Sequence, residues 1–329
     1  MRLSLILSAL VVLASLVMSV YGQQTAEEWL EEGNALFDQG NYIEAIQAYD
    51  KAIRIDPEDS EAWRYKGRAI REKGNYDEAI HAFDEAIRLD PKSASAWIDK
   101  GISLGMQRNR TDAIQAFDEA IELDPGHVDA WYYKGAELSY QGNFAEAIGV
   151  WDEAIRLDPN HSASWSNKGS ALAHLGEYDE AIRAFDEAIR IDPGYAAAWY
   201  NKGNVLTILG KYDEAILAFD EAIRLDPEFA IAWRDKSVPL AYQGQHAKAA
   251  ECIDEAIRLN PNDTHSWINK GLALKSLGKY NEAIRAFDEA IRLDPEYAYA
   301  WNIKGIALYE QGKYAESYAA LKKGEELGG

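Results

Sequence analysis

Adjacent acidic residues are the groups in this chain best suited to acid–base chemistry. One such pair is Asp220–Glu221, and an equivalent pair recurs at regular intervals along most of the chain. A catalytic site needs one unique constellation of groups, whereas a pair that is copied throughout belongs to the scaffold. The sequence therefore predicts a protein that is not an enzyme.

The histidines and the single cysteine offer no pattern for metal binding. The six histidines are scattered, and no two of them are spaced four residues apart as in zinc sites on helices. Phosphate-binding loops, dinucleotide fingerprints, nucleophile elbows and calcium-binding loops are not found either. We therefore expect no metal and no cofactor. A lone cysteine cannot form a disulfide within the chain, so Cys252 is expected to be a small, half-buried hydrophobic residue.

Three arginines at helical spacing form the most distinctive cationic group. Arg64, Arg68 and Arg71 fall at i, i+4 and i+7, which places them on one face of a helix. Guanidinium groups bind carboxylates and phosphates through paired hydrogen bonds, so this face could hold an anion. The alternative is a solvated stripe that pairs with nearby glutamates. Those glutamates are Glu31, Glu61 and Glu72.

These groups are carried by a strict internal repeat. Tryptophan recurs every 34 residues from Trp29 to Trp301, and glycine follows four residues later with one exception. A fixed period of this size is typical of a repeat architecture, in which each unit packs against its neighbours. The repeat-defining residues are Trp63, Trp97, Trp131, Trp165, Trp199 and Trp267, with Gly67, Gly101, Gly135, Gly169, Gly203 and Gly271.

One unit, residues 196–229, predicts two helices. Gly203 leaves room for close helix approach in the first, and Gly210 ends that helix in a left-handed cap. From Tyr212 onward, apolar residues fall at i, i+3, i+4 and i+7 and form one stripe, which Pro227 ends. Neither helix is long enough to be stable alone, so the next unit must cover the stripe.

The order of tryptophan, glycine, alanine, an aromatic residue and proline resembles the tetratricopeptide repeat (TPR) family. The resemblance implies an all-α, right-handed superhelical α-solenoid of helix–turn–helix repeats. Lysine replaces the family's usual leucine three residues after tryptophan, as at Lys202, and this W-x-x-K-G motif resembles uniform arrays of prokaryotic, especially archaeal, proteins. We expect the lysine stem to pack and its ammonium to reach the edge. The predicted solenoid, 26–329, has the repeats 26–59, 60–93, 94–127, 128–161, 162–195, 196–229, 230–263, 264–297 and 298–329.

In TPR proteins the first helices of the repeats line a concave groove. Tyrosine rings there would give contact area and amides would pair with a peptide backbone, which favours an extended peptide or protein segment as the partner. The alternative is that Asn201 and Asn204 are simply frequent residues of the repeat. The family's clamp for carboxylate tails is not expected, because no three consecutive repeats supply its residues. The resemblance assigns to the groove Arg64, Arg68, Arg71, Tyr132, Tyr140, Tyr200, Asn201 and Asn204.

Charge further limits the partners. The chain has 34 lysines and arginines against 55 acidic residues, a net charge of −21, which disfavours nucleic-acid binding. Most of the acidic residues fall on the predicted second helices. By the resemblance, these helices form the outer face.

The first 22 residues are apolar or small, and Arg2 is their only charge. They predict a secretory signal peptide (1–22), and the alternative is an uncleaved N-terminal membrane anchor. Both interpretations make the protein secreted or extracytoplasmic, with membrane contact only through this segment. Three sequons in predicted turns are possible glycosylation sites, at Asn109, Asn160 and Asn262.

Two repeats depart from the pattern. In repeat three, Arg108-Asn109-Arg110 replaces the usual turn, and we expect Asn109 to adopt the left-handed conformation there. In repeat seven, Ser237 replaces the glycine and Pro239 lies inside the first helix. The proline predicts a kink, which is either a hinge that changes superhelical pitch or a tolerated irregularity.

Together these features predict an exported or membrane-anchored TPR scaffold that mediates protein–protein interaction and has no catalytic activity. Its partner would be a peptide or protein segment bound in the concave groove. The alternative is a structural spacer or assembly scaffold at the cell surface that acts through its ends and edges.

Overall fold

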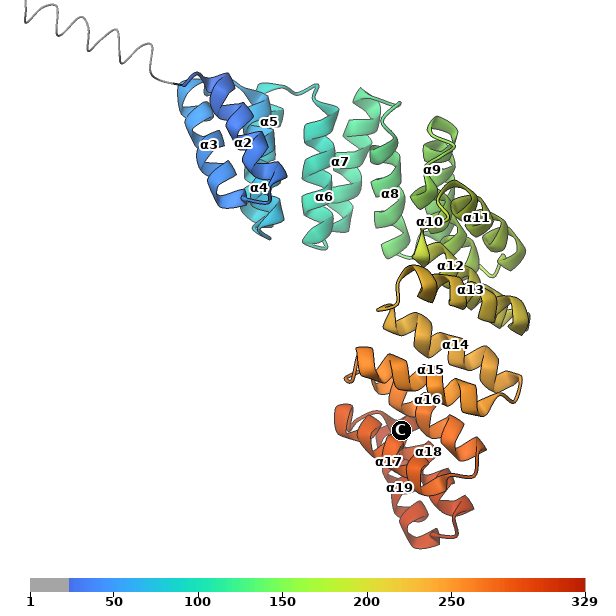
Figure 1. The fold of residues 1–329 in the computed structure, drawn as a ribbon. Coiled ribbons are helices and arrows are strands. Elements are labelled where there is room, and N and C mark those ends of the chain that lie inside the picture. Colours follow the sequence, from blue (N-terminus) through green and yellow to red (C-terminus); the bar gives the residue numbers. More distant parts are fainter. Residues whose placement is uncertain (1–23, 329) are drawn as a thin grey trace, which may run out of the picture. The chain divides into compact units, whose positions relative to one another are not determined.

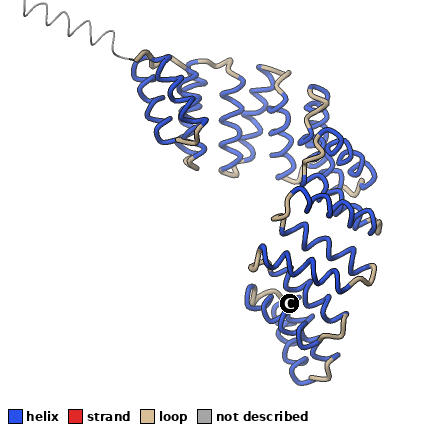
Figure 2. The backbone as a smooth tube through the Cα atoms, viewed as in Figure 1, coloured by secondary structure: helices blue, strands red, loops and turns tan. Residues whose placement is uncertain are grey.

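The computed structural model describes residues 24–328, in which all regular secondary structure is helical (Figure 2). The segment predicted to be a signal peptide or anchor lies outside these residues. The first helices of the repeats are α2 (Ala26–Asp38), α4 (Ser60–Glu72), α6 (Ala94–Met106), α8 (Val128–Tyr140), α10 (Ser162–His174), α12 (Ala196–Ile208), α14 (Ala230–Tyr242), α16 (Thr264–Ser276) and α18 (Ala298–Glu310). The second helices are α3 (Tyr42–Ile55), α5 (Tyr76–Leu89), α7 (Arg110–Leu123), α9 (Phe144–Leu157), α11 (Tyr178–Ile191), α13 (Tyr212–Leu225), α15 (His246–Leu259), α17 (Tyr280–Leu293) and α19 (Tyr314–Gly328).

The chain divides into two compact units between Leu157 and Asp158. Within each unit, the two helices of a repeat form a hairpin, and successive hairpins stack side by side (Figure 1). Each second helix packs against its own first helix and, inside a unit, against the first helix that follows. The predicted all-α repeat architecture is confirmed.

Each hairpin closes around a large side chain of its second helix. In repeat six this is Phe219, which is fully buried against Gly203. A Cβ at position 203 would lie 2.9 Å from the ring, so the predicted close approach of the two helices is confirmed. In repeat seven both partners change together, because Ser237 replaces the glycine and Ile253 replaces the ring. In most repeats, the glycine of the first helix therefore makes room for the aromatic ring of the second helix, and not only for close approach of the two backbones.

The tryptophan, proline and lysine of each repeat form a set of contacts that connects neighbouring hairpins. Trp199 Nε1 donates to the carbonyl oxygen of Pro193 at 3.3 Å. Lys202 Nζ lies 5.6 Å from the centre of the Trp199 ring and 2.6 Å from Asp186 Oδ1 on the preceding second helix. The lysine side chain is only 21% exposed, so its stem packs while its charge is paired at the edge. The same ion pair recurs at Lys66–Asp50, Lys100–Asp84, Lys134–Asp118, Lys236–Asp220, Lys270–Asp254 and Lys304–Asp288.

The turn inside each hairpin requires a residue in the left-handed region. Gly210 has φ +73°, and the Lys211 N–H donates to the Leu206 carbonyl oxygen at 2.9 Å to close the helix cap. In repeat three this residue is Arg108, with φ +63°, whereas Asn109 has φ −82°. The expectation that Asn109 would be left-handed is wrong, because Arg108 stands in register with the glycines of the other repeats.

Replacing Arg108 with glycine should therefore stabilise the first unit by about 1 kcal/mol, because a side chain in the left-handed region costs roughly 1–2 kcal/mol and glycine does not carry that cost. Thermal unfolding followed by circular dichroism measures the change. The control is Arg88→Gly in the exposed part of α5, which should lose about 1 kcal/mol through lower helix propensity. An unchanged or lower melting temperature for the Arg108 variant would contradict the assignment of strain.

Pro239 does not end its helix. α14 is 13 residues long, like the other first helices, and Pro239 is fully buried within it. Ser237 Oγ donates to the carbonyl oxygen of Arg234 at 2.5 Å, in the turn before the proline. The irregularity is accommodated inside a continuous helix, and a hinge at Pro239 stays a prediction.

Candidate functional site

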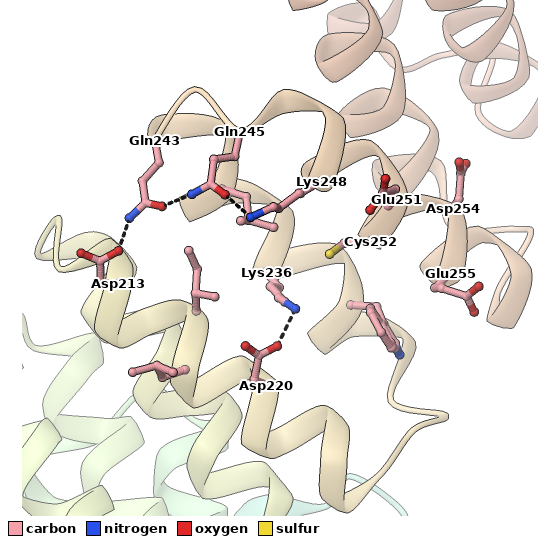
Figure 3. Close-up of a pocket in the computed structure, with 14 residues that line it drawn as sticks. Asp213, Asp220, Lys236, Gln243, Gln245, Lys248, Glu251, Cys252, Asp254 and Glu255 are labelled. Carbon is pink, nitrogen blue, oxygen red and sulfur yellow. Dashed lines mark hydrogen bonds and ion pairs between the residues drawn. The ribbon is translucent and has the colours of Figure 1, made fainter.

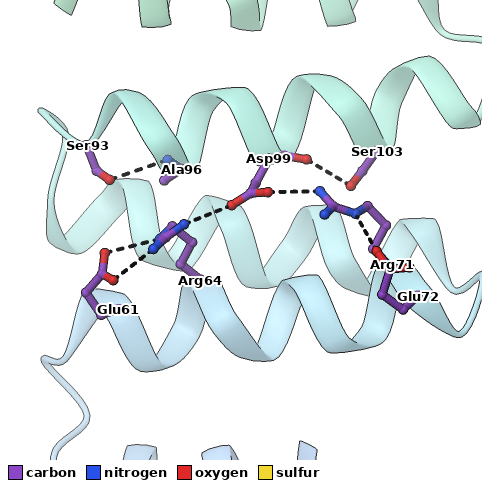
Figure 4. A network of polar contacts seen from close by, with 8 residues as sticks. All are labelled: Glu61, Arg64, Arg71, Glu72, Ser93, Ala96, Asp99 and Ser103. Carbon is purple, nitrogen blue, oxygen red and sulfur yellow. Dashed lines mark hydrogen bonds and ion pairs between the residues drawn. The ribbon is translucent and has the colours of Figure 1, made fainter. Parts of the chain in front are cut away.

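Two of the three arginines of α4, Arg64 and Arg71, lie beside a buried carboxylate on the next first helix (Figure 4). Arg64 Nη1 is 3.2 Å from Asp99 Oδ2, and Arg71 Nη1 is 2.9 Å from Asp99 Oδ1. Arg64 also binds both oxygens of Glu61, at 3.1 and 2.9 Å, and Arg71 contacts Glu72 at 3.5 Å. Asp99 thus joins two guanidinium groups across the interface between repeats two and three.

The carboxylates of this network already pair with the positive charges of Arg64 and Arg71, which an anion would otherwise bind. Burial lowers the pKa of Arg64, but the hydrogen bonds to Glu61 and the charges of Glu61 and Asp99 outweigh it, so the pKa stands above its ordinary value. Arg68 instead lies 5.2 Å from the centre of the Phe37 ring. The alternative of a solvated stripe is confirmed in its pairing with Glu61 and Glu72 but wrong in its exposure, because the Arg64 and Arg71 side chains are only 13% and 10% exposed. Asp99 is a partner that the sequence analysis did not assign. Anion binding at these arginines stays a prediction, and an anion would compete with Asp99.

Tyr200 of α12 is a structural contact between repeats six and seven. Its ring packs 6.0 Å from that of Phe219 and 5.0 Å from that of Phe229, measured between centroids. Its hydroxyl donates to Asp235 Oδ2 at 2.8 Å, and Arg234 Nε donates to Asp235 Oδ1 at 2.7 Å. Burial first, and then the charge of Asp235, raises the pKa of Tyr200 to about 12. Tyr200 therefore stabilises the contact between repeats six and seven. Replacing it would change the packing of these repeats as well as any binding of a partner.

The two predicted asparagines lie on the same helix with different surroundings. Asn201 Nδ2 donates to Ser170 Oγ of α10 at 3.4 Å, which links repeats five and six. Asn204 is half-buried and faces Tyr200, whose pKa its hydrogen bond lowers slightly against the larger effects of burial and charge. Asn201 therefore contacts the neighbouring first helix, whereas the contact of Asn204 lies within α12.

The two predicted tyrosines of α8 differ in exposure. Tyr132 is half-buried and its ring lies 5.1 Å from that of Tyr133, edge to face. Tyr140 is 70% exposed, and the Arg110 guanidinium lies 4.6 Å from the centre of its ring. Of the eight predicted groove residues, Tyr140 presents the largest free apolar surface.

An acidic residue at the sixth position of a first helix could have revealed these polar contacts from the sequence. Asp99 follows Arg64 by 35 residues, and Asp235 follows Tyr200 by the same interval. One period plus one residue therefore places a donor on one first helix beside an acceptor on the next. Searching for donor–acceptor pairs at that interval would have found both networks.

A second feature is the apolar residue that ends several first helices, of which the sequence analysis assigned only Tyr140 to the groove. In the first unit, Met106 and Tyr140 are 53% and 70% exposed. In the second unit, Ile208 and Tyr242 are 63% and 69% exposed. Large apolar side chains left in solvent at the same repeat position are candidates for contacts with a partner.

A hollow of about 820 Å³ lies over helices α13, α14 and α15 (Figure 3). Its polar side chains bind one another: Lys236 Nζ lies 2.5 Å from Asp220 Oδ1, and Gln243 Nε2 donates to Asp213 Oδ1 at 2.7 Å. Cys252 lines the hollow but is only 6% exposed, and burial raises the pKa of its thiol. A protonated, buried thiol is a poor nucleophile, so the hollow offers no reactive group.

The remaining predicted features concern the surface. The sequon residues Asn109, Asn160 and Asn262 are exposed in connections between helices, and their glycosylation stays a prediction. Within residues 24–328, no cluster of three histidine, cysteine or acidic side chains is placed to hold a metal ion. In the same part of the chain, no helix has both the length and the apolar character needed to cross a membrane.

The helical hairpins, their glycine–aromatic packing and their period define a TPR array. Family models described as tetratricopeptide repeat match residues 30–94, 137–196 and 268–327, and further ones match 116–149, 196–229 and 240–263. The chain belongs to the tetratricopeptide repeat family. Arrays of these repeats serve as scaffolds for protein–protein interaction, and this chain has the fold of such a scaffold.

Solved structures of the same fold include the APC/C hetero-tetramer Cut9–Hcn1, with a TM-score of 0.62 and 18% identity. That match covers 85% of this chain and 55% of the other, so this chain spans about half the length of that relative. YrrB, described as a TPR protein with an unusual peptide-binding site, matches at 25% identity over 57% of this chain and 96% of its own, with a TM-score of 0.47. MamA matches at 27% identity over 49% and 94%, with a TM-score of 0.46. No curated protein matches the chain.

Proposed function

We propose that this protein is an exported or membrane-anchored scaffold that binds an extended peptide or protein segment along its first helices and performs no chemistry of its own. The observation that supports this most strongly is the set of exposed apolar side chains at the ends of the first helices. Single exposed apolar side chains are common on protein surfaces, but exposed apolar side chains that recur at one repeat position favour a surface that a partner covers. Hydrogen-bonding side chains between them would hold the partner's backbone.

The contacts within the array limit which residues can bind a partner. Arg64, Arg71 and Tyr200 have their polar groups bound by neighbouring repeats. Tyr140 and Ile208 are 70% and 63% exposed. Within each unit, a partner would therefore touch mainly such end residues, while the paired groups keep adjacent first helices in register.

Selection of a phage-displayed random peptide library on the full chain tests the proposal. Peptides that the wild type selects should bind the double variant Tyr140→Ala with Ile208→Ala roughly tenfold more weakly, which corresponds to a loss of about 1.4 kcal/mol. The matched control is Ile43→Ala with Leu217→Ala, because these residues are 54% and 66% exposed on the second helices. The control should bind as the wild type does, and both variants should keep the melting temperature.

Equal losses in both double variants would contradict binding along the first helices. Selection of no peptide at all, together with self-association of the chain in analytical ultracentrifugation, would favour the spacer or assembly scaffold instead. Export is supported by the sequence of residues 1–22, and the amino-terminal sequence of the protein isolated from cells distinguishes a cleaved signal peptide from a retained anchor.

A further inference from the structure

A separate cavity of about 300 Å³ lies between repeats seven and eight of the second unit. Val238 and Tyr242 of α14 line it on one side and Leu272 and Ser276 of α16 on the other. The floor comes from α15, through His246 and Ile253. Because two first helices form its walls, the cavity belongs to the face on which we propose that a partner binds.

At three positions around the cavity, the residue is smaller than the ring that stands one period earlier. One period earlier, Tyr212 begins the second helix and stacks on Tyr242, with ring centroids 5.1 Å apart and an interplanar angle of 1°. The residues one period after this pair are His246 and Ser276. The buried ring of Phe219 likewise becomes Ile253. Three positions thus lose volume at one place, and the space that a stacked ring fills elsewhere is left open.

Most of the cavity wall is apolar, and its polar side chains are those of Ser237, Asn269, Ser276 and His246. His246 Nδ1 is buried and has no hydrogen-bond partner among residues 24–328. A buried polar atom without a partner costs roughly 1–3 kcal/mol, so a ligand that supplies the missing hydrogen bond would gain from it. No carboxylate, lysine or arginine lines the cavity, and a charged group would be buried there without a counter-charge.

From these contacts we infer that the cavity is a socket for one tyrosine side chain of the bound segment. The inference rests on the proposed function and names the residue that anchors the partner. The phenol ring would lie between Val238 and Leu272 and against the exposed ring of Tyr242. Its hydroxyl would bond to His246 Nδ1, and because a phenol both donates and accepts, it suits either tautomer of the histidine. A phenylalanine would fill the space and leave the nitrogen unsatisfied.

The test uses p-cresol, which is the tyrosine side chain alone, and toluene, which is the phenylalanine side chain. The full chain with labelled methyl groups is titrated with each compound, and NMR shifts are followed at Val238, Ile253 and Leu272. We expect saturable shifts at these methyls with p-cresol and binding of toluene at least fivefold weaker. His246→Tyr places in the socket the ring that repeat six has at this position, and it should abolish binding. Ser276→Tyr fills the socket from the other wall and should do the same.

The control is Leu217→Ala, which removes an exposed side chain of α13 in the same unit and should bind p-cresol as the wild type does. Absence of methyl shifts up to the solubility limit of p-cresol would overturn the socket, as would equal binding of toluene or retained binding in both filled variants. The proposed function fails separately, through the peptide library. If peptides bind the first helices while p-cresol does not enter the cavity, the function stands and the anchor is wrong.

Discussion

Replacing Asp99 with asparagine should cost about 3 kcal/mol of stability in the first unit, because breaking a buried ion pair leaves its partners uncompensated. Asp99 is 7% exposed, and the side chains of Arg64 and Arg71 are 13% and 10% exposed. An amide carries no charge to offset two guanidinium groups. Repeat arrays need not unfold in one step, so hydrogen exchange of the α4 and α6 amides measures the loss where it occurs.

The double variant Asp99→Asn with Arg71→Met provides the control for this network. It removes one of the two uncompensated charges, so it should be more stable than the sum of the single changes predicts. Sulfate should also protect the Asp99 variant more than the wild type, because the freed guanidinium groups would bind it. Unchanged exchange in α4 and α6 of the Asp99 variant would show that the carboxylate is not structural, and the predicted anion site would gain support.

The architecture was predictable because one period controls it. The same signals recur along the chain: a tryptophan every 34 residues, a glycine against a ring in most repeats, and a proline after every hairpin but the last. Arg108 is the exception, and it shows where prediction from residue preferences fails. Register with the other repeats placed it at the left-handed position, whereas residue preference alone favoured Asn109, and register decided the outcome.

The site was less predictable because exposure depends on contacts between repeats. Arg64 and Tyr200 stand at positions that face a groove in the family, but in this chain an acid 35 residues later occupies their polar groups. The socket beside His246 depends on volume missing at several positions at once. No single residue in the sequence predicts such a cavity, because its presence depends on how the neighbouring helices pack.

Replacing Gly101 with alanine should destabilise the first unit by about 2 kcal/mol, although alanine is the better helix former. The new Cβ would lie 2.6 Å from Cε1 of Phe117, a fully buried ring on the second helix of the same hairpin. Overpacking of a core costs roughly 1–3 kcal/mol and so exceeds the gain in helix propensity. Urea unfolding followed by tryptophan fluorescence and by circular dichroism measures the loss.

The chain itself suggests the change that should rescue this variant. Where the glycine is lost in repeat seven, Ser237 is accompanied by Ile253 in place of the ring. Phe117→Ile alone should destabilise through the cavity it leaves, but combined with Gly101→Ala the loss should fall about 1–2 kcal/mol short of the sum. Gly149→Ala is the matched control, because no atom lies within 4 Å of its Cβ position, and it should stabilise α9. Strict additivity at positions 101 and 117 would mean that the glycine serves the turn geometry or folding rate rather than the ring.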